Sequence, residues 1–155
     1  MNPFHWNIKT FEKLTNIELY NIMQLRSEVF VLEQQCLYLD ADGKDIHCTH
    51  VMGTDQHNNL IAYSRIVPAG ISFHEVSIGR VLTSNKDRGI GTGKELMHKS
   101  ISVISNLYGH VPIRIGAQSY LKRFYEKFDF IVVSNEYLED NISHIEMLRD
   151  VNYNL

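Results

Sequence analysis

Two hydrophobic periods run along this chain of 155 residues and together predict an α+β fold. Apolar side chains recur at helical spacing in two long segments, and we expect helices over 15–29 and 92–108. Thr15 and Glu18 have the Thr-x-x-Glu spacing of a capping box, which indicates where the first helix begins. A shorter helix is expected over 120–128.

Short apolar or alternating runs between turn residues predict strands. We expect seven of them, at 5–11, 48–55, 60–68, 72–83, 112–118, 130–133 and 144–148. The polar segment 33–47, which contains Asp40, Asp42 and Asp45, is predicted to be a surface loop. This order of elements indicates a single α+β domain over residues 1–155, with a mixed, mostly antiparallel sheet flanked by helices.

The composition is that of a folded protein, with 44% hydrophobic and 21% charged residues. The net charge of −3 argues against a nucleic-acid binder, which usually presents a basic surface. No stretch approaches the ~18 apolar residues of a membrane span, and the start from Met1 to Trp6 lacks the features of a signal peptide. We therefore expect a cytoplasmic protein without nucleic-acid or membrane partners.

The cysteines Cys36 and Cys48 are too few for a disulfide framework, and we expect two buried thiols. With His47 and His50 they suggest a metal site, but the set lacks the paired spacing of zinc ligands. The three aspartates of the polar segment also lack the glutamate that would complete an EF-hand loop. We expect no metal.

A glycine-rich turn is the segment that carries chemistry. Gly89, Gly91 and Gly93 follow a predicted strand and lead into the helix at 92–108. Glycine lets a ligand approach the main chain, and the free amides and dipole of a helix start favour negative charge. The turn suits a phosphate or pyrophosphate, whereas the alternative is a turn that only begins a helix. Spacing excludes a P-loop, because Arg88 stands where its first glycine belongs, and it excludes the dinucleotide fingerprint.

The segment Arg88–Gly93 has the pattern Arg-x-x-Gly-x-Gly, and here the sequence resembles the GNAT acyltransferase superfamily, whose acyl-CoA pyrophosphate loop has this form. The segment Phe124–Phe130 resembles the family's closing Phe-Tyr-Glu-Lys-x-Gly-Phe, with Asp129 in place of glycine. Because aspartate tolerates left-handed backbone angles, we expect this turn to survive.

The resemblance spans nearly the whole chain and narrows to the ElaA-like branch of the superfamily. Residues 25–34 resemble its Leu-Arg-x-x-Val-Phe-Val-x-Glu-Gln. Residues 139–147 resemble its Glu-Asp-Gly-Ile-Pro-His-Ile-x-Met, with Asn141 and Ser143 replacing glycine and proline. The pattern continues at Tyr38, Asp42, Asp45, His50, 78–81 and 117–118.

The resemblance implies an N-acyltransferase that moves an acetyl group from acetyl-CoA to a primary amine by direct attack in a ternary complex. A splayed strand edge would donate an amide to the carbonyl oxygen, as an oxyanion hole does. Tyr125 matches the family tyrosine near the thiol sulfur, where it protonates the leaving thiolate or orients the sulfur; the alternative is a core tyrosine. The implied cofactor residues are Val81, Leu82, Thr83, Arg88, Gly89, Ile90, Gly91, Thr92, Gly93, Lys94 and Tyr125.

No general base is obvious from the sequence. Glu33, His50, Glu139 and His144 are candidates by residue type. Histidine is the natural choice because it titrates near neutral pH, which leaves His50 and His144 open, and we pair His144 with Tyr125 as the predicted catalytic residues; water is the alternative. Arg80 would hold an acidic group on the acceptor or form an ion pair with Glu33 or Glu139. The predicted acceptor pocket comprises Arg26, Glu33, His50, Arg80, Gln118 and Glu139.

Two other classes of function stay open, a sensor module that binds acyl-CoA without turnover and a structural domain. The acceptor would be a small amine, an aminated sugar or antibiotic, a peptide N-terminus or a lysine. Family analogy also allows a homodimer.

Overall fold

Two antiparallel sheets form the frame of the computed structural model, which describes residues 4–151. The ends of the predicted domain, 1–3 and 152–155, lie outside the described residues. The first sheet has four strands in the order β1 (His5–Thr10), β2 (Thr49–Thr54), β3 (Leu60–Val67) and β4 (Ser77–Thr83). The second has β8 (Ile142–Arg149) paired with β5 (Ile113–Gln118), β6 (Ile131–Val132) and β7 (Tyr137–Glu139).

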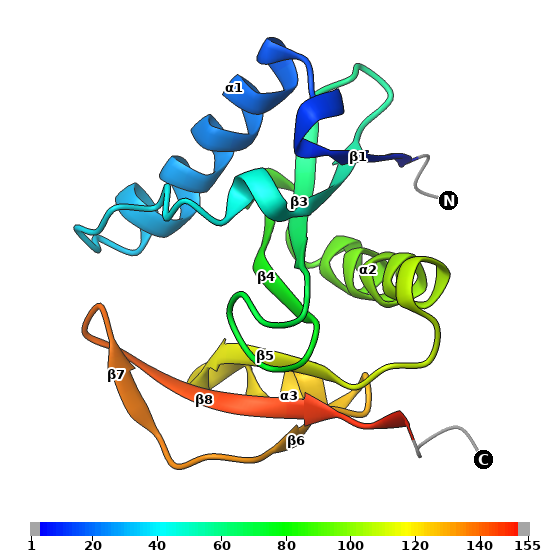
Figure 1. Cartoon of the computed structure of the whole chain (residues 1–155). Helices are drawn as coiled ribbons and strands as arrows, with labels where there is room; N and C mark the ends of the chain where they lie inside the picture. The colour runs from blue at the N-terminus through cyan, green and yellow to red at the C-terminus, as the bar shows by residue number, and fades with distance from the viewer. Residues whose placement is uncertain (1–3, 152–155) are drawn as a thin grey trace.

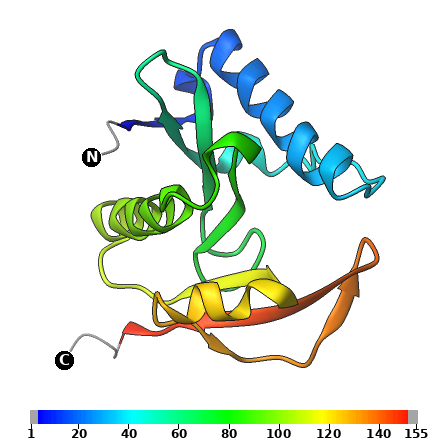
Figure 2. The ribbon, with the colours of Figure 1, turned by 180° about the vertical axis from the view of Figure 1, so that it is seen from behind.

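The two sheets meet where β4 and β5 begin. A single parallel bridge joins Val76 to Ile113, and the Arg114 amide donates to the Val76 carbonyl at 3.0 Å. Beyond this point the strands diverge, so that the sheets form the arms of a V (Figures 1 and 2). The predicted mixed, mostly antiparallel sheet is therefore two antiparallel sheets joined by one parallel contact.

Within residues 4–151, three α-helices cover the sheets: α1 (Asn16–Arg26), α2 (Thr92–Tyr108) and α3 (Lys122–Glu126). The predicted capping box is confirmed, because the Glu18 amide donates to the Thr15 hydroxyl at 3.1 Å and the Thr15 amide donates to the Glu18 carboxylate at 2.9 Å. A wider, π-helical segment, η2 (Ser27–Glu33), continues α1 past its predicted end. The single-turn 3₁₀ helices are Phe11–Lys13, Asp45–His47, Asn85–Asp87 and Ser119–Leu121.

Within the first sheet, β2 and β3 are buried on both faces, because their side chains alternate between two cores. One face packs on α2 through residues such as Val51 and Ala62, in a core that continues into the second sheet. The other face packs on α1 through Met52, Tyr63 and Leu82. No helix among the described residues is long and apolar enough to cross a membrane.

Three sequence predictions need correction. The third strand of the meander begins at Ser77 rather than at residue 72, because 68–76 form an irregular connection. The strand β7 was not predicted, since its three residues are all exposed and show no alternation. The segment 33–47 is not wholly a surface loop, because Asp40 and Asp45 are buried. The predicted left-handed turn at Asp129 is confirmed, with φ of 68°.

Candidate functional site

A cleft of about 1490 Å³ lies between the two arms of the V. Its walls come from β4, β5, η2, the glycine-rich loop before α2, and the hairpin of β7 and β8. The volume exceeds the ~300–1,000 Å³ of an ordinary small-molecule pocket, which leaves room for two reactants. Cys36, three residues after the end of η2, donates a hydrogen bond to the Asp140 carbonyl at 3.1 Å, so the two arms touch at the rim.

The glycine-rich loop opens into this cleft at the start of α2. Gly89 and Gly91 have φ of 81° and 89°, and a Cβ built on either would meet no atom within 4 Å. The Thr92 hydroxyl donates to the Asp87 carbonyl at 3.0 Å and fixes the loop to the preceding turn. The first amides of α2 have no intrahelical acceptor, and the helix dipole adds positive potential there. The loop is therefore a cradle for an anionic group.

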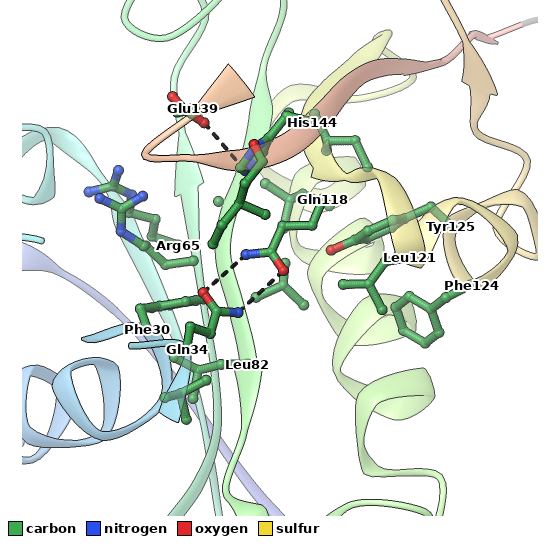
Figure 3. Close-up of a pocket in the computed structure, with 18 of the residues that line it drawn as sticks. Phe30, Gln34, Arg65, Leu82, Gln118, Leu121, Phe124, Tyr125, Glu139 and His144 are labelled. Atoms are coloured by element: carbon green, nitrogen blue, oxygen red, sulfur yellow. Dashed lines mark hydrogen bonds and ion pairs between the residues drawn. The ribbon is translucent and has the colours of Figure 1, made fainter. Parts of the chain in front are cut away.

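Tyr125 lines the cleft from α3. Its ring is buried against Phe124 and Phe130, with ring centroids 5.1 and 6.1 Å away. Burial raises the pKa of the phenol, so the hydroxyl stays protonated at neutral pH. Within residues 4–151 this hydroxyl has no hydrogen-bond partner, and Figure 3 shows it directed toward Gln118. It can therefore donate to a ligand in the cleft.

His144 reaches the cleft from β8, opposite Gln118 on β5. Its Nδ1 lies 2.7 Å from the Ile142 carbonyl, and this contact requires a proton on Nδ1. In the neutral ring Nε2 is then unprotonated, 3.4 Å from the Glu139 carboxylate. The Nε2 atom can therefore accept a proton, and the Glu139 carboxylate lies beside it.

A pair of side-chain amides spans the cleft between its two walls. Gln34 from the end of η2 and Gln118 from β5 each donate to the other at 3.2 Å. In the view of Figure 3, Arg65 and Glu139 lie on one side of this pair and Tyr125 on the other. In that view the pair lies between two parts of the same cleft, which we call the Tyr125 side and the Glu139 side.

Glu33 and Arg88 form a two-point ion pair across the mouth of the cleft. The Arg88 guanidinium donates twice to the Glu33 carboxylate, from Nη2 at 2.6 Å and from Nη1, and it also contacts the Thr83 carbonyl at 3.3 Å. The hydrogen bonds from Arg88 lower the pKa of Glu33. This pair places Glu33 beside the glycine-rich loop rather than deep on the Glu139 side.

Three arginines and three aspartates form a neutral network behind the Glu139 side. Arg26, Arg65 and Arg80 bond to Asp40, Asp42 and Asp45, with N–O distances from 2.5 to 3.4 Å. Burial opposes ionisation of Asp42, but the hydrogen bonds and charge of Arg65 outweigh it and lower the pKa of this carboxyl. The network ties the segment 33–47 to α1, β3 and β4.

The cysteines and acidic residues do not gather into a metal site in the part of the chain that the structure describes, where no group of three or more such residues converges. Cys36 and Cys48 are free thiols. Cys48 is buried and Cys36 is only partly buried, and burial raises the pKa of the Cys48 thiol to about 11. This thiol is protonated and unreactive at neutral pH.

Comparison with known proteins identifies the family. Residues 24–151 match the model of an acetyltransferase (GNAT) domain. The protein ElaA of Escherichia coli is 38% identical over 148 residues, which cover 94% of this chain and 96% of ElaA. The chain belongs to the GNAT acetyltransferase family. The crystal structure of ElaA has a TM-score of 0.88 to this GNAT chain, and the match covers 95% of this chain and 99% of the ElaA chain.

Two further structures share the GNAT fold. An acyl-CoA N-acyltransferase from Pseudomonas aeruginosa is 38% identical, with a TM-score of 0.89 over 94% of this chain and 99% of its own. An aminoglycoside 6'-N-acetyltransferase complexed with coenzyme A is 15% identical, with a TM-score of 0.68 over 94% of this chain and 97% of its own. At that identity the second likeness shows the fold alone.

Most of the predicted cofactor and acceptor residues line the cleft of this GNAT domain. Ile90 and Thr92 are exceptions among the cofactor residues, because Ile90 is exposed and the Thr92 side chain is buried against Asp87. Both can contribute only main-chain amides. The predicted residues in the cleft are Glu33, Arg80, Val81, Leu82, Thr83, Arg88, Gly89, Gly91, Gly93, Lys94, Gln118, Tyr125, Glu139 and His144.

Arg26 and His50 were assigned to the acceptor pocket, and the structure corrects both assignments. Neither side chain reaches the cleft, and both are 0% exposed. Arg26 donates to Asp40 at 2.7 Å and to Asp45 at 2.6 Å. The His50 ring bonds to the Tyr63 hydroxyl at 2.7 Å and to the Asp45 carbonyl at 2.9 Å. These residues build the scaffold behind the site.

Arg80 lines the cleft, but its ion-pair partners are not those expected. Sequence reasoning offered Glu33 or Glu139, whereas the guanidinium bonds to Asp40 and Asp42. Gln34 and Arg65 also line the cleft and were not predicted. The ElaA-like pattern included Gln34, so the resemblance was a signal for that residue, while no motif pointed to Arg65.

Acidification below about pH 6.5 is expected to destabilise the protein through His50. Burial lowers the pKa of this ring, so the unfolded chain, in which imidazole titrates near 6.5, binds the proton first. The contribution of His50 to stability is complete above that pH. It is lost as the pH falls toward the native pKa, with a slope of at most about 1.4 kcal/mol per pH unit.

Urea unfolding at roughly pH 7 and pH 5.5 measures this loss, with His50→Gln as the non-titrating control. The free energy of unfolding should fall more steeply in the native sequence than in the variant. Equal losses would mean that His50 titrates alike in the folded and unfolded chains.

Proposed function

We propose that the protein transfers an acetyl group from acetyl-CoA to a primary amine by direct attack in a ternary complex. One observation carries the proposal: the glycine-rich cradle, the Tyr125 hydroxyl and the Nε2 atom of His144 open into one cleft. The cradle supplies anion binding, and the two side chains supply a proton donor and a proton acceptor. Family membership supports acyl transfer as the reaction class.

The cradle suits the pyrophosphate of an acyl-CoA. Gly89 and Gly91 leave space on the cleft side of the loop, and the amides from Ile90 to Lys94 would bind the phosphate oxygens. Main chain at Val81, Leu82 and Thr83 would lie along the pantetheine arm on the Tyr125 side of the cleft. An aminoglycoside 6'-N-acetyltransferase of the same fold is complexed with coenzyme A, which supports coenzyme A derivatives as the class of ligand. Bound acetyl-CoA supplies an activated thioester.

Tyr125 serves the leaving group in this proposal. As the amine nitrogen bonds to the carbonyl carbon, the carbon–sulfur bond breaks and negative charge develops on sulfur. The protonated Tyr125 hydroxyl, which has no partner within the described chain, donates a hydrogen bond to that sulfur. Its raised pKa favours stabilisation of the thiolate over complete proton transfer, and the proton that sulfur finally takes can come from solvent.

His144 serves the attacking amine. Its Nδ1–H is held by the Ile142 carbonyl, so Nε2 accepts the proton that the nitrogen loses as the amide forms. Glu139 then stabilises the imidazolium across 3.4 Å. Gln118 and Glu139 would contact the acceptor on this side of the cleft, whereas Glu33 is assigned to the cofactor side by its pair with Arg88.

His144→Gln is expected to lower kcat by about 10²–10⁴-fold, the usual contribution of a general base. Tyr125→Phe should lower kcat by about tenfold or more, because only one hydrogen bond to sulfur is lost. Tyr120→Phe is the control, since this exposed tyrosine also lines the cleft but has no assigned role. Steady-state assays of thiol release measure all three. An unchanged kcat in His144→Gln would mean that water, rather than His144, accepts the proton of the amine.

Initial-velocity kinetics with both substrates varied test the ternary complex. Direct attack predicts intersecting double-reciprocal lines, because both substrates must be bound before either product leaves. Parallel lines would indicate an acylated enzyme intermediate and contradict the proposal. Binding of acetyl-CoA without release of free thiol in the presence of any primary amine would favour a sensor module.

A further inference from the structure

Arg80 has a backbone conformation that its residue type does not favour. Its φ is +49°, in the left-handed region where a side chain costs free energy. Glycine stands one position earlier, but Gly79 does not have a positive φ. The chain therefore places the unfavourable angle on an arginine although a glycine is adjacent, so contacts in the surrounding structure have to compensate for the strain.

The strained residue lies in a bulge of β4. Arg65 of β3 pairs with Gly79 and Tyr63 pairs with Leu82, so Arg80 and Val81 together face the single residue Ser64. In one type of β-bulge the first residue on the bulged strand is left-handed, and that position is usually a glycine. A bulge bends its strand and leaves one residue out of the ladder. The bend lies on the wall where the V opens.

The Arg80 side chain is held from several directions. Its Nε donates to Asp40 Oδ1 at 2.8 Å, and its Nη2 donates to the Asp40 carbonyl at 3.0 Å. The guanidinium lies over the rings of Phe30 and Tyr38, with centroids 6.0 and 5.7 Å away. Asp40 is itself fixed by Arg26 at 2.7 Å. These contacts occupy the charge that an acceptor would otherwise meet, and they can compensate for the backbone strain.

We propose that Arg80 is a positioning residue: its anchored side chain holds position 80 left-handed and so fixes the bulge that presents the main chain of Val81 and Leu82 to an acyl-CoA. Its use in catalysis rests on the function proposed above, whereas its effect on the bulge does not. This role differs from direct binding of the acceptor, which the sequence suggested. It predicts that the backbone angle at position 80, rather than the positive charge, matters for the cofactor.

Two substitutions separate the angle from the charge. Arg80→Gly removes the side chain but keeps the left-handed conformation accessible, whereas Arg80→Ala removes the side chain and disfavours that conformation. Titration calorimetry with acetyl-CoA should give an affinity within about threefold of the native value for Arg80→Gly. For Arg80→Ala we expect about a tenfold loss, which corresponds to about 1.4 kcal/mol. Arg114→Ala, which removes a side chain that bonds Glu75 and Glu146 but does not itself line the cleft, should leave the affinity unchanged.

Backbone amide shifts of 78–83, measured by NMR without ligand, test the bulge independently. They should be preserved in Arg80→Gly and displaced in Arg80→Ala. Equal losses of affinity in both variants, or native affinity and native shifts in Arg80→Ala, would overturn the positioning role. If the native protein does not bind acetyl-CoA while the shifts behave as described, the proposed function fails and the effect of Arg80 on the bulge stands.

Discussion

Replacing Gly91 with glutamate is expected to weaken the affinity for acetyl-CoA by at least about 100-fold, or about 2.7 kcal/mol. Gly91 immediately precedes α2 with φ of 89°, where any side chain is strained, and its Cβ direction leads into open space. The glutamate side chain would fill the cradle and set a negative charge against the phosphates. Titration calorimetry with acetyl-CoA measures the loss.

Gly91→Asn is the matched control, because asparagine tolerates the left-handed region and adds no charge. It should retain more affinity than Gly91→Glu, and thermal unfolding should show both variants folded. A folded Gly91→Glu variant with native affinity would mean that the glycine-rich loop only begins a helix.

Replacing Arg26 with methionine is expected to cost about 3–5 kcal/mol of unfolding free energy, the largest stability effect of any substitution considered. The guanidinium is fully buried and bonds to both Asp40 and Asp45, so its removal leaves two buried carboxylates short of a partner. Urea unfolding measures the change.

Arg88→Ala is the control, since its ion pair with Glu33 is well exposed and such pairs contribute about 0–1 kcal/mol. Arg26→Met should therefore lower the free energy of unfolding, whereas Arg88→Ala should affect cofactor binding. A loss below about 1 kcal/mol for Arg26→Met would contradict the scaffold role and reopen its place in the acceptor pocket.

Features set by local sequence could be predicted closely. The helix α2 was placed at its observed bounds, because an unbroken apolar stripe lies between a glycine-rich start and Gly109. The capping box at Thr15 depends only on residues three positions apart. The short strand β7 depends instead on pairing with β8. Its residues are all exposed, so they show no alternation of apolar and polar positions that would predict a strand.

The site was predicted in part, for a comparable reason. A motif marks positions such as Arg26 and His50, but it does not say whether their side chains face a cleft or a core. That distinction depends on Asp40 and Asp45, which meet Arg26 across 14 and 19 positions of the chain. The contact of Glu33 with Arg88 spans 55 positions and likewise exists only once η2 and the glycine-rich loop lie side by side.

The most direct test of the central claim is product formation from acetyl-CoA and a panel of primary amines, followed by thiol release and by mass spectrometry of the amine. The proposed function predicts that free thiol and an N-acetylated amine appear together in equal amounts. Neither should appear when the amine is omitted. Tight binding of acetyl-CoA with no acetylated product from small amines, aminated sugars, peptide N-termini or lysine peptides would contradict it.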